Sequence, residues 1–323
     1  MAKPDYIYAA ARIRAKELSC FSASTLEQLM ACKSDEECLR LLGEKGWGNG
    51  SAQQTPESLL EQERNKTWDQ LRELVEDMHI FDVFLYANDY HNLKAAIKEN
   101  YAPSHGADIY NPNGTIDPTL LRQAVESHDF SLLPPAMADA AEEALSTLRE
   151  TGDGQLCDIT LDHAALRAVA DAGKASGSEL LAFYAEHTVA CADIKIAVRC
   201  QRTGKSLAFV QRALVPCDTL DVSQLAQASV ESFDAICDYL ARTDYEGAVE
   251  ALSHSASAFE RWCDNRLIQK IQPQKYETSS IGPLAAWLLA RENEIKTVRI
   301  LLSGKRNGLS DDAIRERLRE MYV

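Results

Sequence analysis

The sequence lacks a surplus of positive charge and has no long uncharged run. Its 323 residues include 34 Lys and Arg against 49 Asp and Glu, which gives a net charge of −15. This charge disfavours nonspecific binding to the phosphates of nucleic acid or to an anionic lipid surface. The longest uncharged run has 13 residues, from Thr278 to Ala290, whereas a helix needs about 20 to span a bilayer. We therefore expect no nucleic-acid partner and no direct membrane insertion.

The N-terminal residues lack the apolar stretch of a secretory signal peptide, since charged residues begin at Lys3 and continue through an amphipathic segment. We expect a cytoplasmic protein. No two cysteines are spaced as in a CxxC motif, so zinc ribbons and thioredoxin-type redox sites are unsupported. In a reducing compartment the nine cysteines are expected to be small buried apolar residues; they are residues 20, 32, 38, 157, 191, 200, 217, 237 and 263.

Alternation typical of β-strands is almost absent, and no turn dipeptide joins two β-branched runs. Segment 6–19 instead has helix-forming residues throughout, and Thr55 followed by Pro56 has the cap and first residue of another helix. Two more helices are expected near the C-terminus, one over 284–302 and one that Ser310 caps and that runs to about Tyr322. The sequence predicts an all-α fold.

Two helical signals recur three times in the same order. The first is a cap residue followed by Ser or Thr, Leu and Gln, and its copies are Ser22–Gln28, Asp117–Gln123 and Asp221–Gln227. The second is a polar residue followed by an aliphatic residue, Lys, any residue and a small apolar residue. Its copies begin 101 residues apart, at Asn92, Asp193 and Glu294. We interpret the chain as three similar helical domains in tandem.

The predicted domains are residues 1–112, 113–216 and 217–323. Each has the common size of about 100 to 150 residues, and loops rich in Pro and Gly lie near both boundaries, at 101–118 and 202–221. Segment 6–19 has no obvious copy in the second and third domains.

Between the two signals each copy has an Asp that is expected just inside a helix start, at Asp35, Asp129 and Asp244. Two of these starts have the residues of a capping box. The pairs are Ser34 with Glu37, and Thr243 with Glu246.

No motif points to catalysis. Arg202–Ser206 ends like a phosphate-binding P-loop, but it lacks the first Gly and follows a helix, so we interpret it as a helix terminus and turn. Gly46–Gly50 lacks the dinucleotide fingerprint and is interpreted as a helix stop. The seven histidines form no HExxH motif. We predict no catalytic, cofactor-binding or metal-binding residues and no cofactor.

Lys94, Lys195 and Lys296 occupy the same position of the second signal. Their recurrence favours a shared structural role on the outer face of each helix. The alternative is three equivalent contacts around a pseudo-threefold axis.

Three blocks resemble a known family: Tyr8–Arg14, Asn88–Lys94 and Pro283–Arg299. They are similar to the C subunit of V/A-type ATP synthases, which is related to the d subunit of the eukaryotic vacuolar ATPase. The Asn-Asp-x-His-Asn-Leu-Lys block is the most specific of them. The resemblance covers essentially the whole chain, with a loose alignment over 134–190.

The resemblance implies a pseudo-threefold funnel of three helical domains. It also implies a non-catalytic central-stalk subunit that couples the central-shaft subunits D and F to the ring of proteolipid subunits, for proton or sodium transport. Such a protein is peripheral on the cytoplasmic face of the membrane and is held there by other subunits.

Two other hypotheses belong to different classes. A free-standing α-helical repeat scaffold would bind other protein partners, but solenoids of that kind have repeats of roughly 35 to 50 residues, whereas the second signal recurs at 101. An all-helical enzyme that uses Cys or His is the third hypothesis, and no nucleophile with a credible base supports it.

Overall fold

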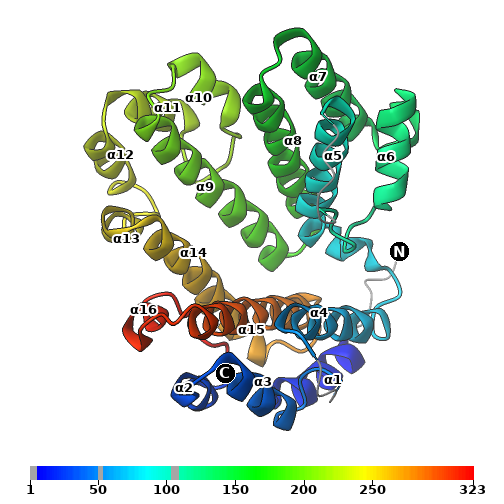
Figure 1. Ribbon diagram of the computed structural model, residues 1–323, viewed down its shortest axis with the longest axis vertical. Coiled ribbons are helices and arrows are strands. Elements are labelled where there is room, and N and C mark those ends of the chain that lie inside the picture. Colours follow the sequence, from blue (N-terminus) through cyan, green and yellow to red (C-terminus); the bar gives the residue numbers. More distant parts are fainter. Residues whose placement is uncertain (1–5, 50–53, 103–108) are drawn as a thin grey trace. The chain divides into compact units, whose positions relative to one another are not determined.

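The computed structural model describes residues 6–49, 54–102 and 109–323 (Figure 1). Every regular element in these ranges is a helix, and no strand occurs among them. The predicted all-α class is therefore confirmed.

The chain divides into two compact units. We call residues 1–78 with 247–323 the terminal unit, since it contains both ends of the sequence, and residues 79–246 the middle unit. The predicted domains 1–112, 113–216 and 217–323 describe copies within the sequence, and that division stays a prediction.

Four helices of the middle unit enclose one apolar core. They are α5 (Tyr86–Tyr101), α6 (Pro118–Ser127), α7 (Pro135–Thr151) and α8 (Gly154–Ala175), and the short 3-10 helix η2 (Phe130–Leu132) packs beside α7. Leu93, Ile97, Leu121 and Leu161 are fully buried in this core. The range 134–190, where the family resemblance is loose, folds into α7, α8 and the start of α9.

The rest of the middle unit is built on α9 (Glu179–Arg202), which runs beside α8 (Figure 1). Gly173 lies where α8 and α9 approach most closely, because a Cβ there would stand 2.2 Å from the Cβ of Ala185. Three shorter helices pack on α9: α10 (Leu207–Ala213), α11 (Val222–Glu231) and α12 (Phe233–Leu240). A 3-10 helix, η1 (Met78–Phe84), precedes α5.

The terminal unit combines helices from the two ends of the sequence. The N-terminal ones are α1 (Ile7–Glu17), α2 (Ala23–Ala31), α3 (Asp35–Glu44) and α4 (Pro56–Arg72). The C-terminal ones are α13 (Ala248–His254), α14 (Ala256–Ile271), η3 (Gln272–Tyr276), α15 (Gly282–Arg306) and α16 (Asp311–Arg315).

Helix α15 forms the centre of the terminal unit, with α4 running alongside it in Figure 1. It also packs against α1, α3 and α14. Because neighbours cover it on several sides, even its charged residues Arg291 and Glu294 are buried. A helix that is buried all round must satisfy its polar side chains internally, and this requirement produces the site described below.

The caps predicted from the first signal are confirmed. Ser22, Asp117 and Asp221 are the N-caps of α2, α6 and α11, and each side chain accepts a hydrogen bond from a backbone N–H in the first turn. Thr55 caps α4 with Pro56 as its first residue. Asp35 begins α3 after the cap Ser34.

Other predictions of where helices begin, or of which segments are loops, were wrong. No helix begins at Asp244, since the Thr243 hydroxyl donates to the carbonyl of Leu240 and so closes α12 instead of capping a new helix. Asp129 does not lie inside an α-helix but caps η2. Helix α10 lies in a segment that was expected to be a loop.

The predicted helix from Ser310 to about Tyr322 was also wrong beyond its first turns. Ser310 caps α16, but this helix ends at Arg315. The following backbone bonds to other helices, because the N–H of Glu320 donates to Asn265 at 2.9 Å and its carbonyl accepts from Asn293 at 2.9 Å. These tertiary hydrogen bonds replace the intrahelical ones.

Candidate functional site

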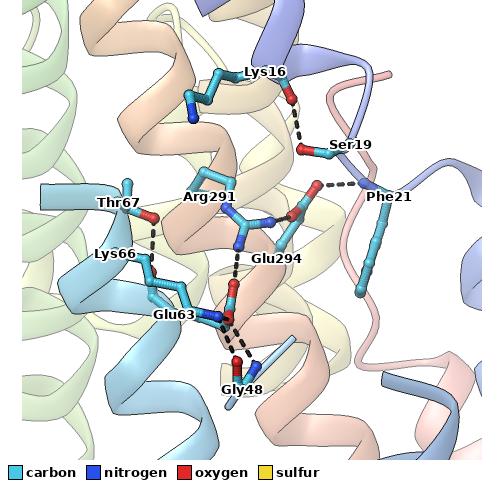
Figure 2. Close-up of polar contacts among 9 residues, drawn as sticks. All are labelled: Lys16, Ser19, Phe21, Gly48, Glu63, Lys66, Thr67, Arg291 and Glu294. Carbon is cyan, nitrogen blue, oxygen red and sulfur yellow. Dashed lines mark hydrogen bonds and ion pairs between the residues drawn. The ribbon is translucent and has the colours of Figure 1, made fainter. Parts of the chain in front are cut away.

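A cluster of buried charges lies between α4 and α15 in the terminal unit (Figure 2). The guanidinium of Arg291 stands between two carboxylates: it donates to Glu63 Oε2 at 2.7 Å and also pairs with Glu294. Arg291, Glu63 and Glu294 are only 7%, 4% and 1% exposed. We call these three residues the buried triad.

The buried triad also holds two loops of the N-terminal half. The backbone N–H of Phe21 donates to Glu294 Oε1 at 2.5 Å, and that of Gly48 donates to Glu63 Oε1 at 2.9 Å. Lys66 adds a second bond on this side, since its ammonium group contacts both Glu63 at 2.8 Å and the Gly48 carbonyl at 2.6 Å. Figure 2 shows these contacts converging from α4, α15 and the two loops.

Aromatic rings cover the guanidinium. The centre of the Arg291 guanidinium lies 4.9 Å from the Trp47 ring, and Trp47 stacks on Phe21 with 4.8 Å between ring centroids. A planar cation suits this position because it bonds carboxylates in its plane and contacts rings through its faces.

Burial governs the electrostatics of the triad. Desolvation raises the pKa of Glu294, and Arg291 together with the Phe21 N–H opposes that rise by favouring the carboxylate. Desolvation is also the main cause that raises the pKa of the neighbouring thiol of Cys20, followed by the charge of Glu294. The two carboxylates are hydrogen-bonded to protein groups, so the triad is suited to fastening segments together and unsuited to acid–base chemistry on a substrate.

Glu294 belongs to a set of three recurring residues. Asn92, Asp193 and Glu294 begin the three copies of the second signal, and all three are essentially fully buried. Each side-chain oxygen accepts a backbone N–H from another segment: from Asn111 at 2.7 Å, from Val215 at 3.0 Å, and from Phe21 at 2.5 Å. We call these residues the three clamps.

The segment that each clamp holds leads into a helix of the first signal. Asn111 precedes the cap Asp117 of α6, and Val215 precedes the cap Asp221 of α11. Phe21 directly precedes the cap Ser22 of α2. The clamp of the third copy therefore holds the start of the first copy, 273 residues away.

A second contact repeats in the middle unit. The N–H and hydroxyl of Thr115 donate to Asp89 at 2.8 and 2.7 Å, and those of Thr219 donate to Glu186, both at 2.7 Å. Each carboxylate lies on the long helix that precedes its Thr. Desolvation raises the pKa of Asp89 in spite of these hydrogen bonds. Both threonines thus fasten a loop to the helix behind it.

The recurring lysines lie where the sequence predicts, on α5, α9 and α15. Lys94 pairs with Asp162 of α8, and Lys296 pairs with Asp264 of α14 at 2.5 Å. Lys195 is exposed on α9. The ion pairs of Lys94 and Lys296 agree with the predicted structural role. The three clamps lie two residues before these lysines and were not predicted as functional residues. Their recurrence every 101 residues is the sequence feature that indicates them.

The motifs that were interpreted as helix ends have that structure. Arg202 ends α9, Gly204 has a φ of +63°, and Ser206 caps α10. Gly46, with a φ of +86°, follows the end of α3, and Gly50 lies outside the described residues. None of the nine cysteines forms a disulfide among the described residues, and seven are buried while Cys217 and Cys237 are half-buried.

The histidines differ from one another in environment. His187 is buried and stacks on Phe183, whereas His91 is exposed. In the part of the chain that the structure describes, no group of three His, Cys, Asp or Glu side chains is arranged to hold a metal ion.

A hollow of about 510 Å³ lies beside α7 in the middle unit. His128, in a left-handed conformation with a φ of +57°, lies on its wall next to Arg149. The hydroxyls on the wall bond elsewhere, since Ser131 donates to Asp129 and Ser146 donates to Glu150. His128 and these serines therefore do not form a nucleophile and base pair.

Replacing Arg291 with Ala is expected to destabilise the protein by about 3–5 kcal/mol, because the buried Glu294 loses its counter-charge and Glu63 keeps only that of Lys66. Denaturant unfolding measured by circular dichroism checks this value. Arg40→Ala is the matched control: its side chain is 73% exposed and 3.9 Å from Glu37, so its effect should stay within about 0.5 kcal/mol. Equal effects of the two variants would contradict a stabilising triad.

The free energy of unfolding is expected to fall as the pH rises because of Asp193. Its Oδ2 has no hydrogen-bond partner among the described residues, and desolvation raises its pKa to about 8. Between about pH 4 and pH 8 the folded state therefore binds a proton that the unfolded state lacks, so stability falls with pH by at most about 1.4 kcal/mol per unit.

Asp193→Asn should remove that loss, since the amide stays neutral, as Asn92 is at the equivalent position. Melting temperatures from pH 4 to pH 8 check this, and the advantage of the variant over the wild type should grow with pH. The exposed Asp139→Asn serves as control. A constant difference across the range would show that Asp193 is not protonated in the fold.

Among the described residues no helix is both long and apolar enough to cross a bilayer.

Residues 9–317 match the family described as ATP synthase (C/AC39) subunit. The chain is also 25% identical to the C subunit of the V-type sodium ATPase of Enterococcus hirae, an alignment that covers 96% of this chain and 97% of the relative. The resemblance seen in the sequence is thus confirmed, and the chain belongs to the C/AC39 family of non-catalytic V-type ATPase subunits.

Proposed function

We propose that this chain is the central-stalk subunit that couples the shaft subunits D and F to the proteolipid ring of a rotary V/A-type ATPase or ATP synthase. In this role it receives the tip of the shaft, rests on the ring at the cytoplasmic face of the membrane, and transmits torque. It catalyses no reaction itself. The transported ion is a proton or sodium, and the membrane subunits select it.

The observation that carries this proposal is the set of three clamps. A part that transmits torque must not shear between its modules, and each clamp fixes a helix of the second signal to the segment that leads into the next helix of the first signal. Glu294 extends the pattern from the third copy to the first. A cyclic set of such links supports a closed arrangement of three copies around an axis, the pseudo-threefold funnel that the sequence predicts.

The buried polar bonds suit a stiff part. Close-packed helices have low compressibility and transmit strain, and hydrogen bonds in a buried environment are stronger than exposed ones. The clamps and the buried triad all lie inside, where solvent does not compete. This supports a rigid socket more than an adaptable scaffold for varied partners.

Copurification tests the proposed partners. The full-length chain, immobilised through a tag, is incubated with the purified D–F heterodimer and, separately, with detergent-solubilised proteolipid ring. We expect both to be retained in stoichiometric amounts, and no ATP hydrolysis by the chain alone. Resin that carries an unrelated helical protein of similar charge is the control.

Failure to retain either D–F or the ring would contradict the coupling role. Retention of D–F without the ring would leave a shaft-binding protein that is not a coupler, which also contradicts the proposal.

A further inference from the structure

Helix α1, whose segment has no obvious copy in the second and third predicted domains, has apolar residues on two faces. One face is buried and includes Ala9, Ala10 and Ile13, on the side where α1 packs against α15. The other face is exposed, with Ile7 at 58%, Tyr8 at 67% and Leu18 at 89%. A helix that served only the core would have a polar outer face.

The exposed apolar residues form one continuous strip. With 3.6 residues per turn, Ile7, Leu18, Ala11, Ala15 and Tyr8 fall, in this order, within an arc of about 100°. All five are exposed. We call these five residues the α1 strip.

Tyr276 of η3 extends the α1 strip. It is 88% exposed, and Arg14, at the edge of the strip, donates to the carbonyls of Gln274 and Glu277 on either side of it. Large exposed side chains gathered in this way mark an interaction surface, whereas single ones do not. Tyrosine and leucine with adjacent cations match the composition of interface centres, where aromatic residues and Arg are enriched.

The polar edge of the strip is cationic. Arg12 and Lys16 lie on the far side of Tyr8, and Arg12 donates to the Tyr8 hydroxyl at 2.8 Å. No carboxylate among the described residues pairs with either of them. These cations stand out in a chain of net charge −15. A partner with carboxylates at the edge of an apolar surface would complement both features.

We propose that the α1 strip with Tyr276 is a docking surface for another subunit of the ATPase complex, one that presents apolar side chains edged by carboxylates. The proposal rests on the proposed function, since it needs a complex to join. Arg12 and Lys16 alone give little attraction to anionic lipid, and the overall negative charge of the chain opposes it. A protein surface therefore fits better than the bilayer itself.

The experiment uses membranes that carry the rest of the complex after this subunit has been stripped off. Full-length wild type, L18S/Y276S and R12E/K16E are added back, and the retained subunit is quantified together with ATP-driven ion transport. Because the changed apolar side chains are almost fully exposed in the isolated chain, the melting temperature should not change. Retention of L18S/Y276S should fall about tenfold or more, and that of R12E/K16E several-fold.

Matched controls are Leu132→Ser, an apolar residue that is 55% exposed in the middle unit, and Lys45→Glu, an exposed cation after α3. Both should be retained like the wild type. Wild-type retention of the strip variants would overturn the docking surface and leave the proposed function intact. A wild type that is itself not retained would overturn the proposed function, and the docking surface with it.

A parallel arm replaces the membranes with protein-free vesicles of phosphatidylcholine and phosphatidylglycerol. We expect no binding there. Binding that L18S/Y276S abolishes would show that the strip docks on lipid and would overturn a protein partner.

Discussion

The terminal unit depends on the pairing of Arg291 with Glu63 and Glu294 inside a layer of packed helices. Breaking this pairing would leave the Glu294 carboxylate without a counter-charge in a buried position, at a cost comparable to a large part of the stability of a domain. The same pairing decides which segments belong together, because Glu294 also holds Phe21 and Glu63 also holds Gly48. Both ends of the sequence must therefore be present before the unit can form, and its contacts are of high contact order.

The three clamps make the same kind of contact with three different side chains, since each accepts a backbone N–H while it is buried. Asn92 both donates to and accepts from the backbone of Asn111, so its amide is satisfied by a single residue. Glu294 forms an ion pair with Arg291. Asp193 has one oxygen without a described partner, and desolvation raises its pKa to about 8, which favours the neutral carboxyl group in this buried position. The position tolerates different residues because its function is to accept one backbone N–H from a neighbouring segment.

Much of the local structure could be predicted from the sequence, since caps such as Ser22, Asp117 and Asp221 act within one turn of the chain. The helix class and the glycine turns follow from equally local signals, and the recurring lysines follow from their spacing of 101 residues. The buried triad could not be predicted, because Glu63 and Arg291 are 228 residues apart and look like surface charges on amphipathic helices. The C-terminal residues could not be predicted for the same reason. The N–H of Glu320 donates to Asn265 and its carbonyl accepts from Asn293, and these hydrogen bonds outweigh the helix propensity of 316–322.

In the proposed torque-transmitting role, the relevant property is that the two chain ends do not separate under load. Native-state hydrogen exchange of the isolated chain, followed by mass spectrometry, measures this directly. The account predicts that peptides covering residues 21–31 and 291–302 become exposed together, with the same opening free energy, because Glu294 and Arg291 join them. Exchange of residues 21–31 at low free energy, while 291–302 stays protected, would contradict it.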